Sequence, residues 1–413
     1  MEWDYLLKEF IYACIFIKNT NLKIQIFIDL MKYVILLADG MADEPLPEYD
    51  NKTPIEIAYT PHFDKIAREG AMGLVKTVPD SLEPASDVAN LSLLGYDPKE
   101  NYTGRGPLEA LSIGASLTDT DIAYRCNLVT IENDTMIDST AGHISNEEGA
   151  LLIDTLSKAI SDITFYPGIS YRNLLIVPNG KNAQTQPPHN IIGEKIHEFL
   201  PRGKDAALLR ACMVKAHEIL QDHPINKARI KVGKTSANWI WPWNGGTSPQ
   251  LKPFSEVFGI SGGVISGVDL LKGIAIAAGM KPISVPGATG YLDTDYMAKA
   301  RYALDALKEL DLVYVHVEAP DEAGHMGNVK EKILALERID EMLGLFLAKF
   351  DGCIAVLPDH PTPLLKRIHT SDPVPFAIYG KDLDETTCFC EKEAAKGKYG
   401  KITGPMFMPL LLR

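Results

Sequence analysis

The sequence predicts an α/β fold with a mainly parallel sheet at its core and an α/β cap domain inserted into that core. Three short apolar runs favour it, at residues 33–38, 312–317 and 353–357, and each is followed within a few residues by aspartate or histidine. Continuous apolar runs are typical of parallel strands buried on both faces, and polar residues after such strands collect at one edge of the sheet. At 413 residues the chain is long enough for two domains.

Composition and charge indicate an ordinary globular protein. The formal net charge of −13 argues against the phosphate backbone of nucleic acid as a partner. A few local arginines can still bind a small anionic substrate against that background. The six cysteines are scattered and give no disulfide framework. We therefore expect reduced thiols and a cytoplasmic protein with neither a nucleic-acid nor a membrane partner.

The first thirty residues are expected to be an N-terminal extension. Their apolar run, at residues 10–17, is too short to span a bilayer. They also lack the basic start and the small-residue cleavage site of a signal peptide. Because the first expected strand begins just after Met31, we interpret the extension as the product of an upstream start codon. An added amphipathic helix is the alternative.

The first expected strand, residues 33–38, ends at Asp39, which could bind a metal or cap a helix. Helical character follows at residues 54–70, where Thr60 and Pro61 form a helix start signal. Ser86 then stands directly ahead of an apolar helical pattern, as a helix cap would. The same position suits a nucleophile, because a helix N-terminus and a bound metal both favour the ionised hydroxyl. These two roles stay open at this point.

Two clusters near the C-terminus have the composition of a paired divalent-metal site. The first holds Asp321 and His325, and the second holds Asp359 and His360, with His369 nine residues further on. Because Asp321 and His325 are four residues apart, one helical turn would place both side chains on one face. The alternative is a polar loop after each strand, with an aspartate capping the helix expected to begin near Val329.

Taken in chain order, several motifs resemble those of the archaeal-type, cofactor-independent phosphoglycerate mutases of the alkaline phosphatase superfamily. They are Asp39-Gly40, SDVANLSLLGYDP at 86–98, GRG at 104–106, DEAGH at 321–325, and Asp359-His360. The resemblance implies an alkaline-phosphatase-like core and a glycolytic isomerase that interconverts 3-phosphoglycerate and 2-phosphoglycerate. It further implies a phosphoserine intermediate at Ser86 and no requirement for 2,3-bisphosphoglycerate or an organic cofactor.

The resemblance also implies which residues hold two metal ions. Asp39, Ser86, Asp359 and His360 would bind one ion, and Asp321, His325 and His369 would bind the other. Manganese or zinc suits this mixture of carboxylate and imidazole better than calcium or magnesium alone.

Substrate specificity is expected to lie in an insertion at residues 102–266, between core segments 31–101 and 267–413. Arg125 and Arg172 lie in stretches that match the substrate-binding arginines of the family, and an arginine fork suits a phosphate or a carboxylate. Arg105 and His189 are further candidates, and Lys272 resembles a lysine near the phosphoryl group. Ordinary surface salt bridges and a solvated helix lysine are the alternatives. An acid–base carboxylate in the insertion, such as Asp121, is also possible.

Several departures from the mutase pattern leave the acceptor open. Residues 239–246 (WIWPWNGG) lack the expected basic residue, Pro361 stands where serine is commoner, and Glu318 and Pro320 precede Asp321 where lysine and a small polar residue are usual. Similar changes occur in a branch proposed to act as a homoserine kinase, which makes a homoserine-directed phosphotransferase the alternative function. A non-catalytic metal-binding protein on the same scaffold is a third hypothesis.

Overall fold

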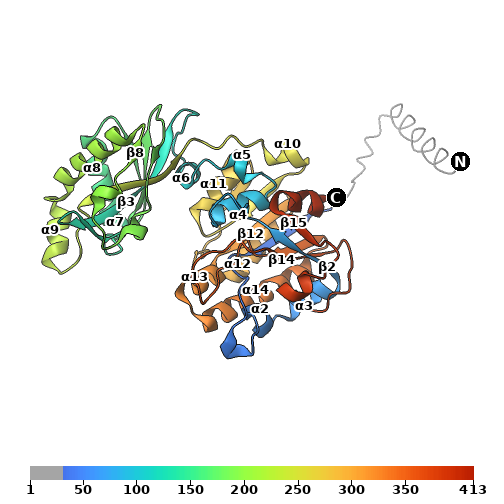
Figure 1. Ribbon diagram of the computed structural model, residues 1–413. Coiled ribbons are helices and arrows are strands. Elements are labelled where there is room, and N and C mark those ends of the chain that lie inside the picture. Colours follow the sequence, from blue (N-terminus) through green and yellow to red (C-terminus); the bar gives the residue numbers. More distant parts are fainter. Residues whose placement is uncertain (1–30) are drawn as a thin grey trace, which may run out of the picture. The chain divides into compact units, whose positions relative to one another are not determined.

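A computed structural model describes residues 31–413 (Figure 1). The expectation for residues 1–30 lies outside the described residues. Within residues 31–413, no helix combines the length and the apolar character needed to cross a membrane. The cytoplasmic location and the lack of a nucleic-acid partner stay predictions.

The core is an eight-stranded sheet in which β14 alone, among the described strands, runs against the others. In spatial order its strands are β11 (Lys281–Ile283), β10 (Gly262–Ile265), β12 (Leu312–Val317), β1 (Tyr33–Ala38), β13 (Cys353–Leu357), β14 (Val374–Tyr379), β2 (Gly70–Lys76) and β15 (Lys401–Thr403). The three expected apolar runs form three adjacent strands, with β1 paired in parallel to β12 on one side and β13 on the other. The expected fold class is therefore confirmed.

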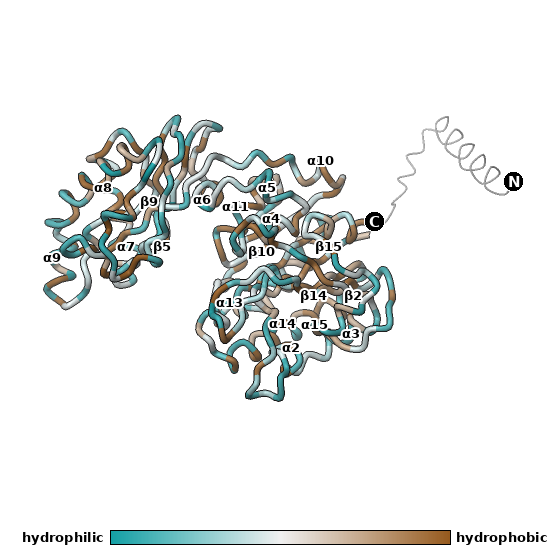
Figure 2. The backbone as a smooth tube through the Cα atoms, viewed as in Figure 1, coloured by the Kyte–Doolittle hydropathy of each residue, from teal (hydrophilic) through white to brown (hydrophobic). Residues whose placement is uncertain are grey.

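Helices cover both faces of this sheet, which explains why its strands are apolar throughout. Alternate residues of β1 pack into two separate apolar clusters, one on each face. The first face packs against α3 (Pro61–Arg68), α12 (Tyr296–Ala306) and α14 (Val329–Lys349). The second packs against α4 (Ser86–Leu93), α11 (Asp269–Ala277) and α16 (Phe407–Leu412). Figure 2 shows hydrophobic colour along the strands between these helices and hydrophilic colour on many of the outer loops.

The remaining helices of this part of the chain are short. They are α2 (Pro54–Ile57), α5 (Pro98–Asn101), α6 (Arg105–Ser112), α10 (Phe254–Phe258), α13 (Ala319–Met326) and α15 (Glu391–Ala394), with the 3₁₀ turns η1 (Pro47–Tyr49) and η4 (Gly404–Met406). The expected helical stretch at 54–70 is divided into α2 and α3, and each begins with a proline in its first turn. Helix α14 begins at Val329 as expected, and Asn328 rather than an aspartate caps it.

A second, antiparallel sheet is built around the long strand β3. Its strands are β3 (Ile122–Glu132), β4 (Thr135–Asp138), β5 (Thr164–Ile169), β6 (Arg172–Val177) and β9 (Trp239–Gly246). The other elements of this region are β7 (Ala183–Gln184), β8 (Arg202–Gly203), α7 (Asn146–Ala159), α8 (Ala206–Leu220), α9 (Pro224–Lys231), η2 (Pro188–Ile191) and η3 (Ile196–Glu198). Strand β10 already belongs to the core sheet, so the chain rejoins that sheet before residue 267.

A buried ion pair ties the loop after β1 to helix α14. The Nζ atom of Lys332 lies 2.6 Å from Oδ2 of Asp43, and both side chains are fully buried. Lys332 also donates to the carbonyl oxygen of Thr362 at 2.9 Å. Asp43 accepts from the backbone N–H of Leu364 at 3.2 Å. Because Thr362 and Leu364 belong to the loop after β13, the pair fixes that loop beside the loop after β1.

Replacing Lys332 by alanine is expected to destabilise the fold strongly. Removing one partner of a buried ion pair leaves the other charge uncompensated and typically costs about 3–5 kcal/mol. The loss should appear as a lower free energy of unfolding in urea. Lys308→Ala is the matched control, because the Lys308–Asp305 pair is about three-quarters exposed on both sides and should contribute little. Equal effects of the two substitutions would contradict a structural role for the buried pair.

Candidate active site

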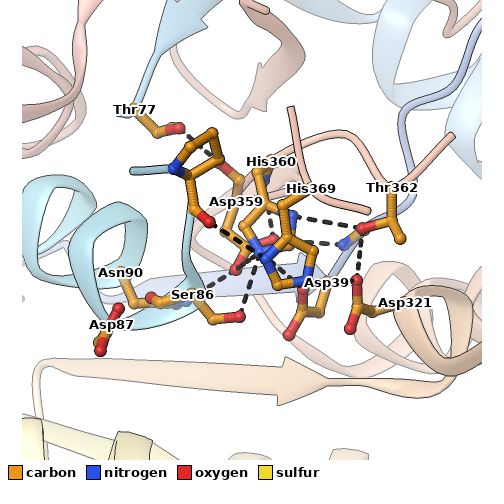
Figure 3. A network of polar contacts seen from close by, with 12 residues as sticks. Asp39, Thr77, Ser86, Asp87, Asn90, Asp321, Asp359, His360, Thr362 and His369 are labelled. Atoms are coloured by element: carbon orange, nitrogen blue, oxygen red, sulfur yellow. Dashed lines mark hydrogen bonds and ion pairs between the residues drawn. The ribbon is translucent and has the colours of Figure 1, made fainter. Parts of the chain in front are cut away.

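The ends of three adjacent strands bring aspartate and histidine side chains together at one edge of the core sheet. Asp39 follows β1 directly, and Asp359 and His360 lie just after β13. Asp321 lies in the first turn of α13, shortly after β12. These four side chains are at most 5% exposed. Figure 3 shows them converging on one point.

Asp359 is oriented by hydrogen bonds to both of its carboxylate oxygens. Oδ1 accepts from the backbone N–H groups of Gly40 at 3.2 Å and His360 at 2.8 Å. Oδ2 accepts from the side-chain amide of Asn90 at 2.9 Å. Asn90 lies one turn after Ser86 on α4 and also donates to the Ser86 carbonyl at 2.8 Å. The same amide thus holds the carboxylate and ties the helix that carries Ser86 to it.

One carboxylate oxygen of Asp39 accepts no hydrogen bond from the described residues, although Nε2 of His360 lies 3.6 Å from it. Its Oδ2 lies 3.0 Å from Nε2 of His316. Its Oδ1 is buried and has no hydrogen-bond partner among residues 31–413. Burial, with the charges of Asp359 and Asp321, raises the pKa of Asp39 well above its usual range. A divalent cation would satisfy the free oxygen and offset the repulsion between the carboxylates.

Two histidines face Asp321. His325 lies one helical turn along α13, as its spacing predicts, with Nε2 3.3 Å from Oδ2 of Asp321. His369 places its Nε2 3.4 Å from Oδ1. The Nδ1 atoms lie 3.0 Å and 3.4 Å from the carbonyl oxygens of Arg367 and Pro84 respectively. Because a carbonyl only accepts, Nδ1 of each ring is the atom that donates to it, and Nε2 is left facing the aspartate. There Nε2 can donate to the carboxylate when the ring is protonated, and it would be the ligand atom if a metal ion were bound.

The charge state of Asp321 also suits a metal ligand. Burial acts to raise its pKa, but the hydrogen bonds with His325 and His369 outweigh burial and hold the pKa well below its usual value. The same contact with Asp321 raises the pKa of His325 to about 9. Asp321 is therefore ionised at neutral pH, as a carboxylate ligand must be.

Gly40 permits the close packing beside Asp321. Its φ of +64° lies in the left-handed region, and a Cβ there would come within 2.6 Å of the Asp321 Cα and 2.7 Å of the Thr362 hydroxyl oxygen. Thr362 donates that hydroxyl to Asp321. The loop held by Lys332 thus supports the cluster directly.

Ser86 does not cap its helix, so that interpretation is wrong. Helix α4 begins at Ser86 itself, and Ala85 occupies the cap position. Among the described residues, no side chain forms a cap hydrogen bond with the start of this helix. The Ser86 hydroxyl oxygen lies instead 3.1 Å from Nε2 of His360. It faces the cluster from a helix N-terminus, where the helix dipole favours negative charge.

Within the described residues, two groups of side chains have the spacing of a metal site. Their members are Asp39, Asp359 and His360 in one group, and Asp321, His360 and His369 in the other. The potential ligand atoms of each group lie within 4.8 Å of one another. His360 belongs to both groups, while His325 adjoins the second through Asp321. Oxygen and imidazole donors together with the free Asp39 oxygen fit divalent metal ions, and the division of ligands between two ions stays a prediction.

A cavity of about 590 Å³ extends from this cluster to the antiparallel sheet. Its wall includes Arg105, Arg125 and Arg172, together with Glu109 of α6. Glu109 accepts from Nε of Arg105 at 2.9 Å and from Nε of Arg125 at 3.1 Å. Burial acts to raise the pKa of Glu109, but the charges of Arg125 and Arg105 lower it. Within the described residues, the terminal nitrogens of both arginines donate no hydrogen bond, which leaves them available to a ligand.

Comparison with known proteins assigns the family. The family model described as 2,3-bisphosphoglycerate-independent phosphoglycerate mutase matches residues 67–226. A protein of that name from Methanothrix thermoacetophila is 47% identical over 390 residues, which cover 92% of this chain and all of the relative. This chain belongs to the family of 2,3-bisphosphoglycerate-independent phosphoglycerate mutases.

Solved structures agree with this family. A protein from Pyrococcus horikoshii is 34% identical with a TM-score of 0.82, and the match covers 92% of this chain and 96% of the other. The cofactor-independent phosphoglycerate mutase of Thermoplasma acidophilum is 28% identical with a TM-score of 0.66, over 92% and 99% of the two chains. The predicted family is confirmed, and none of these relatives favours the homoserine kinase alternative.

Not every residue expected from the mutase family lies in the cavity. His189 lines it, with its ring edge-on to Trp243 at a centroid distance of 5.4 Å. Lys272 donates to Asp269 at 3.1 Å. Asp269 lines the cavity, but Lys272 is not among the described residues of its wall. The role of Lys272 near the phosphoryl group stays a prediction. Asp121 lies outside the described wall and binds two backbone N–H groups at a turn, which indicates a structural role.

Several residues of this site were missed by reasoning from the sequence, among them His316 and Thr362, which bind Asp39 and Asp321. Asn90 could have been found, because it lies four residues after Ser86 and so shares its helix face. Glu109 has the same relation to Arg105, but nothing in the sequence shows that it also reaches Arg125. Glu318 was noticed only as a departure, without a role.

Substituting the shared histidine should remove more metal than substituting a ligand of one group. His360→Ala takes a donor from both groups, so both ions should be lost, whereas Asp321→Asn should mainly lower the content of one. Elemental analysis of the purified variants measures this. Glu322→Gln is the control, because Glu322 lies on the same helix and lines the cavity but belongs to neither group. Full metal content in His360→Ala would contradict the assignment.

Proposed function

We propose that this chain interconverts 3-phosphoglycerate and 2-phosphoglycerate through a phosphoserine at Ser86, with two divalent ions, manganese or zinc, held by the clusters described above. The observation that carries the proposal is the position of the Ser86 hydroxyl. It lies within 3.1 Å of His360 and lines the same cavity as three arginines. A nucleophile, a metal-ligand cluster and an anion-binding wall together supply the parts that phosphoryl transfer needs.

The first half-reaction moves the phosphoryl group from substrate to enzyme. Bound divalent ions would neutralise phosphoryl oxygens and favour ionisation of the serine hydroxyl. The Ser86 oxygen attacks phosphorus, the bond between phosphorus and the 3-oxygen of glycerate breaks, and that oxygen takes up a proton. The helix N-terminus at Ser86 favours the negative charge that develops on and around the serine oxygen.

The second half-reaction returns the group to a different oxygen. Glycerate turns within the cavity, and its 2-hydroxyl oxygen gives up its proton and attacks the phosphorus of phosphoserine. The bond between phosphorus and the Ser86 oxygen breaks, and that oxygen takes up a proton, which restores the hydroxyl. The arginines suit this step, because guanidinium groups can hold the carboxylate while the rest of the molecule turns. Water must stay out of the cavity while phosphoserine exists, since hydrolysis would release glycerate and phosphate.

We also propose the division of labour expected from the sequence. Segments 31–101 and 267–413 would bind metal and carry the nucleophile. The insertion expected at 102–266, which in the structure ends before β10, would bind substrate. The arginines support this division, because Arg125 and Arg172 belong to the antiparallel sheet. No observation on the described residues favours homoserine as the acceptor.

Ser86→Ala should abolish turnover while the fold survives. Loss of a nucleophile typically lowers kcat by several orders of magnitude. Since Ser86 is not a helix cap, its substitution should leave the unfolding midpoint nearly unchanged. The assay follows 2-phosphoglycerate formation and, by intact mass, phosphorylation of the chain. Ser92→Ala is the control, on the same helix and with a buried hydroxyl that lacks a partner among the described residues; near-normal turnover of Ser86→Ala would exclude the phosphoserine mechanism.

Arg172→Ala should weaken substrate binding without destabilising the protein. Arg172 donates to the hydroxyl of Tyr171 at 3.2 Å but makes no ion pair with the described residues. Losing a charge-assisted hydrogen bond to an anion costs about 1.5–3 kcal/mol, or roughly ten- to a hundredfold in KM for 3-phosphoglycerate. Arg202→Ala is the control, because Arg202 is also exposed in the insertion but lies outside the described cavity wall. An unchanged KM in Arg172→Ala would remove this residue from the binding site.

A further inference from the structure

Glu318 carries a carboxyl group that has no role in the metal-ligand cluster and does not pair with the arginines of the cavity wall. It follows β12 directly, occupies the cap position of α13 and lines the cavity. Its Oε2 atom is buried and has no hydrogen-bond partner among residues 31–413. A buried acceptor without a donor is unfavourable, so such a group in a cavity wall indicates a donor supplied from outside the chain.

Neighbouring cations do not bind this carboxyl within the described chain. Lys299 is fully buried, but its Nζ donates to the carbonyl oxygen of His316 at 3.1 Å. Arg105 pairs with Glu109. Both cations are close enough to act on Glu318 through their charges, yet neither forms an ion pair with it. The carboxyl therefore keeps its acceptor capacity.

Gly290 makes the room that Glu318 occupies. A Cβ on Gly290 would lie 2.6 Å from Oε2 of Glu318, closer than real Cβ contacts come. Gly290 also lines the cavity. Either carboxyl oxygen can turn toward the cavity, because rotation about the last bond of a glutamate has a broad profile.

The proposed substrate has one kind of donor to offer. Its phosphate and carboxylate are acceptors that suit the arginines and the metal cluster, and its free hydroxyl is the remaining polar group. Among the other carboxyls of the cavity wall, Asp39 and Asp321 belong to the metal groups, Glu109 is bound by two arginines, and Asp269 accepts from Lys272. Glu322 also lies in the wall, but Glu318 is the one of the two with an oxygen closed off from water.

We infer that Glu318 accepts a hydrogen bond from the free hydroxyl of the bound phosphoglycerate and thereby selects a hydroxy acid as substrate. The inference rests on the proposed function. It does not depend on the charge of Glu318, because a carboxylate and a neutral carboxyl both offer an acceptor oxygen. The contact also gives glycerate an anchor between the two half-reactions, which opposes its escape before the phosphoryl group is returned.

A thermodynamic cycle between side chain and hydroxyl tests this contact. In metal-loaded Ser86→Ala protein, where no transfer occurs, calorimetry gives the Kd of 3-phosphoglycerate and of 3-phosphooxypropanoate, which lacks the 2-hydroxyl. Adding Glu318→Ala should weaken binding of 3-phosphoglycerate at least tenfold more than binding of the deoxy analogue. The effect of the removed charge is common to both anions and cancels in the comparison. Equal changes for both ligands would overturn the inference.

Two further variants keep the test decisive. Glu322→Ala removes a carboxyl from the same helix and cavity wall, and it should change both ligands equally. Gly290→Ala leaves the chemistry of Glu318 intact but displaces its carboxyl, so it should reproduce the selective loss. If Glu318→Ala does not fold, Gly290→Ala decides the matter, and an unselective effect there would also overturn the inference.

Turnover separates this inference from the proposed function. In protein that retains Ser86, Glu318→Ala should release more glycerate and inorganic phosphate for each 2-phosphoglycerate formed. Wild-type protein that forms no 2-phosphoglycerate with metal bound would refute the proposed function itself. Wild-type conversion with an unchanged product ratio in Glu318→Ala would refute only the role of Glu318.

Discussion

Three aspartates and four histidines share a small region at one edge of the core sheet. The repulsion among the three carboxylates is the constraint on which the surrounding structure depends. Buried like charges cannot all ionise at ordinary pH unless cations or hydrogen-bond donors compensate them. Asp359 receives donors from two backbone N–H groups and from Asn90, and Asp321 receives them from Thr362 and two histidines. Within the described residues, one Asp39 oxygen accepts no hydrogen bond, which would leave part of the compensation to a bound metal ion.

Most groups that donate hydrogen bonds to these carboxylates, such as Asn90, Thr362 and the backbone N–H groups, are neutral, and there is a physical reason for this. A lysine beside the carboxylates would compensate their charge without a metal and so compete with it. Lys332, fully buried on α14, is bound instead to Asp43, and it reaches the cluster only through the backbone of Thr362. Positive charge of the chain therefore stabilises the loop that carries the ligands, while the ligands themselves stay available to divalent ions.

The sequence was most informative where one pattern has one structural consequence. Apolar runs ending near Asp39, Asp321 and Asp359 predicted parallel strands that deliver ligands to one edge, and the sheet order confirms it. The residue pattern alone could not assign Ser86, because a cap and a nucleophile occupy nearly the same position in sequence. The structure excludes the cap, since Ala85 takes that position, and the role of nucleophile stays a proposal. The partners of Glu109 and Glu318 were beyond sequence reasoning, since they depend on how segments distant along the chain pack together.

The tryptophan-rich strand β9 explains the most conspicuous departure from the mutase pattern, the missing basic residue at 239–246. Strand β9 pairs with β3 so that Trp243 stands opposite Arg125, whose guanidinium carbon lies 4.3 Å from the indole centroid. The indole N–H donates to Asn127 at 3.0 Å, which fixes the ring beneath the arginine. Trp243 thus holds an existing cation in a stacked position rather than removing one from the cavity.

The arginines of the cavity wall also indicate an anionic ligand. The wall contains six carboxyl groups in all, but around Glu109 the balance is locally positive. This one carboxylate lies near all three guanidinium groups and binds two of them through Nε. A surplus of that kind matches a ligand with two anionic groups, such as phosphoglycerate, better than it matches the single carboxylate and the ammonium group of homoserine. The lack of a basic residue in β9 is therefore compensated within the same wall, and it gives no reason to prefer a zwitterionic acceptor.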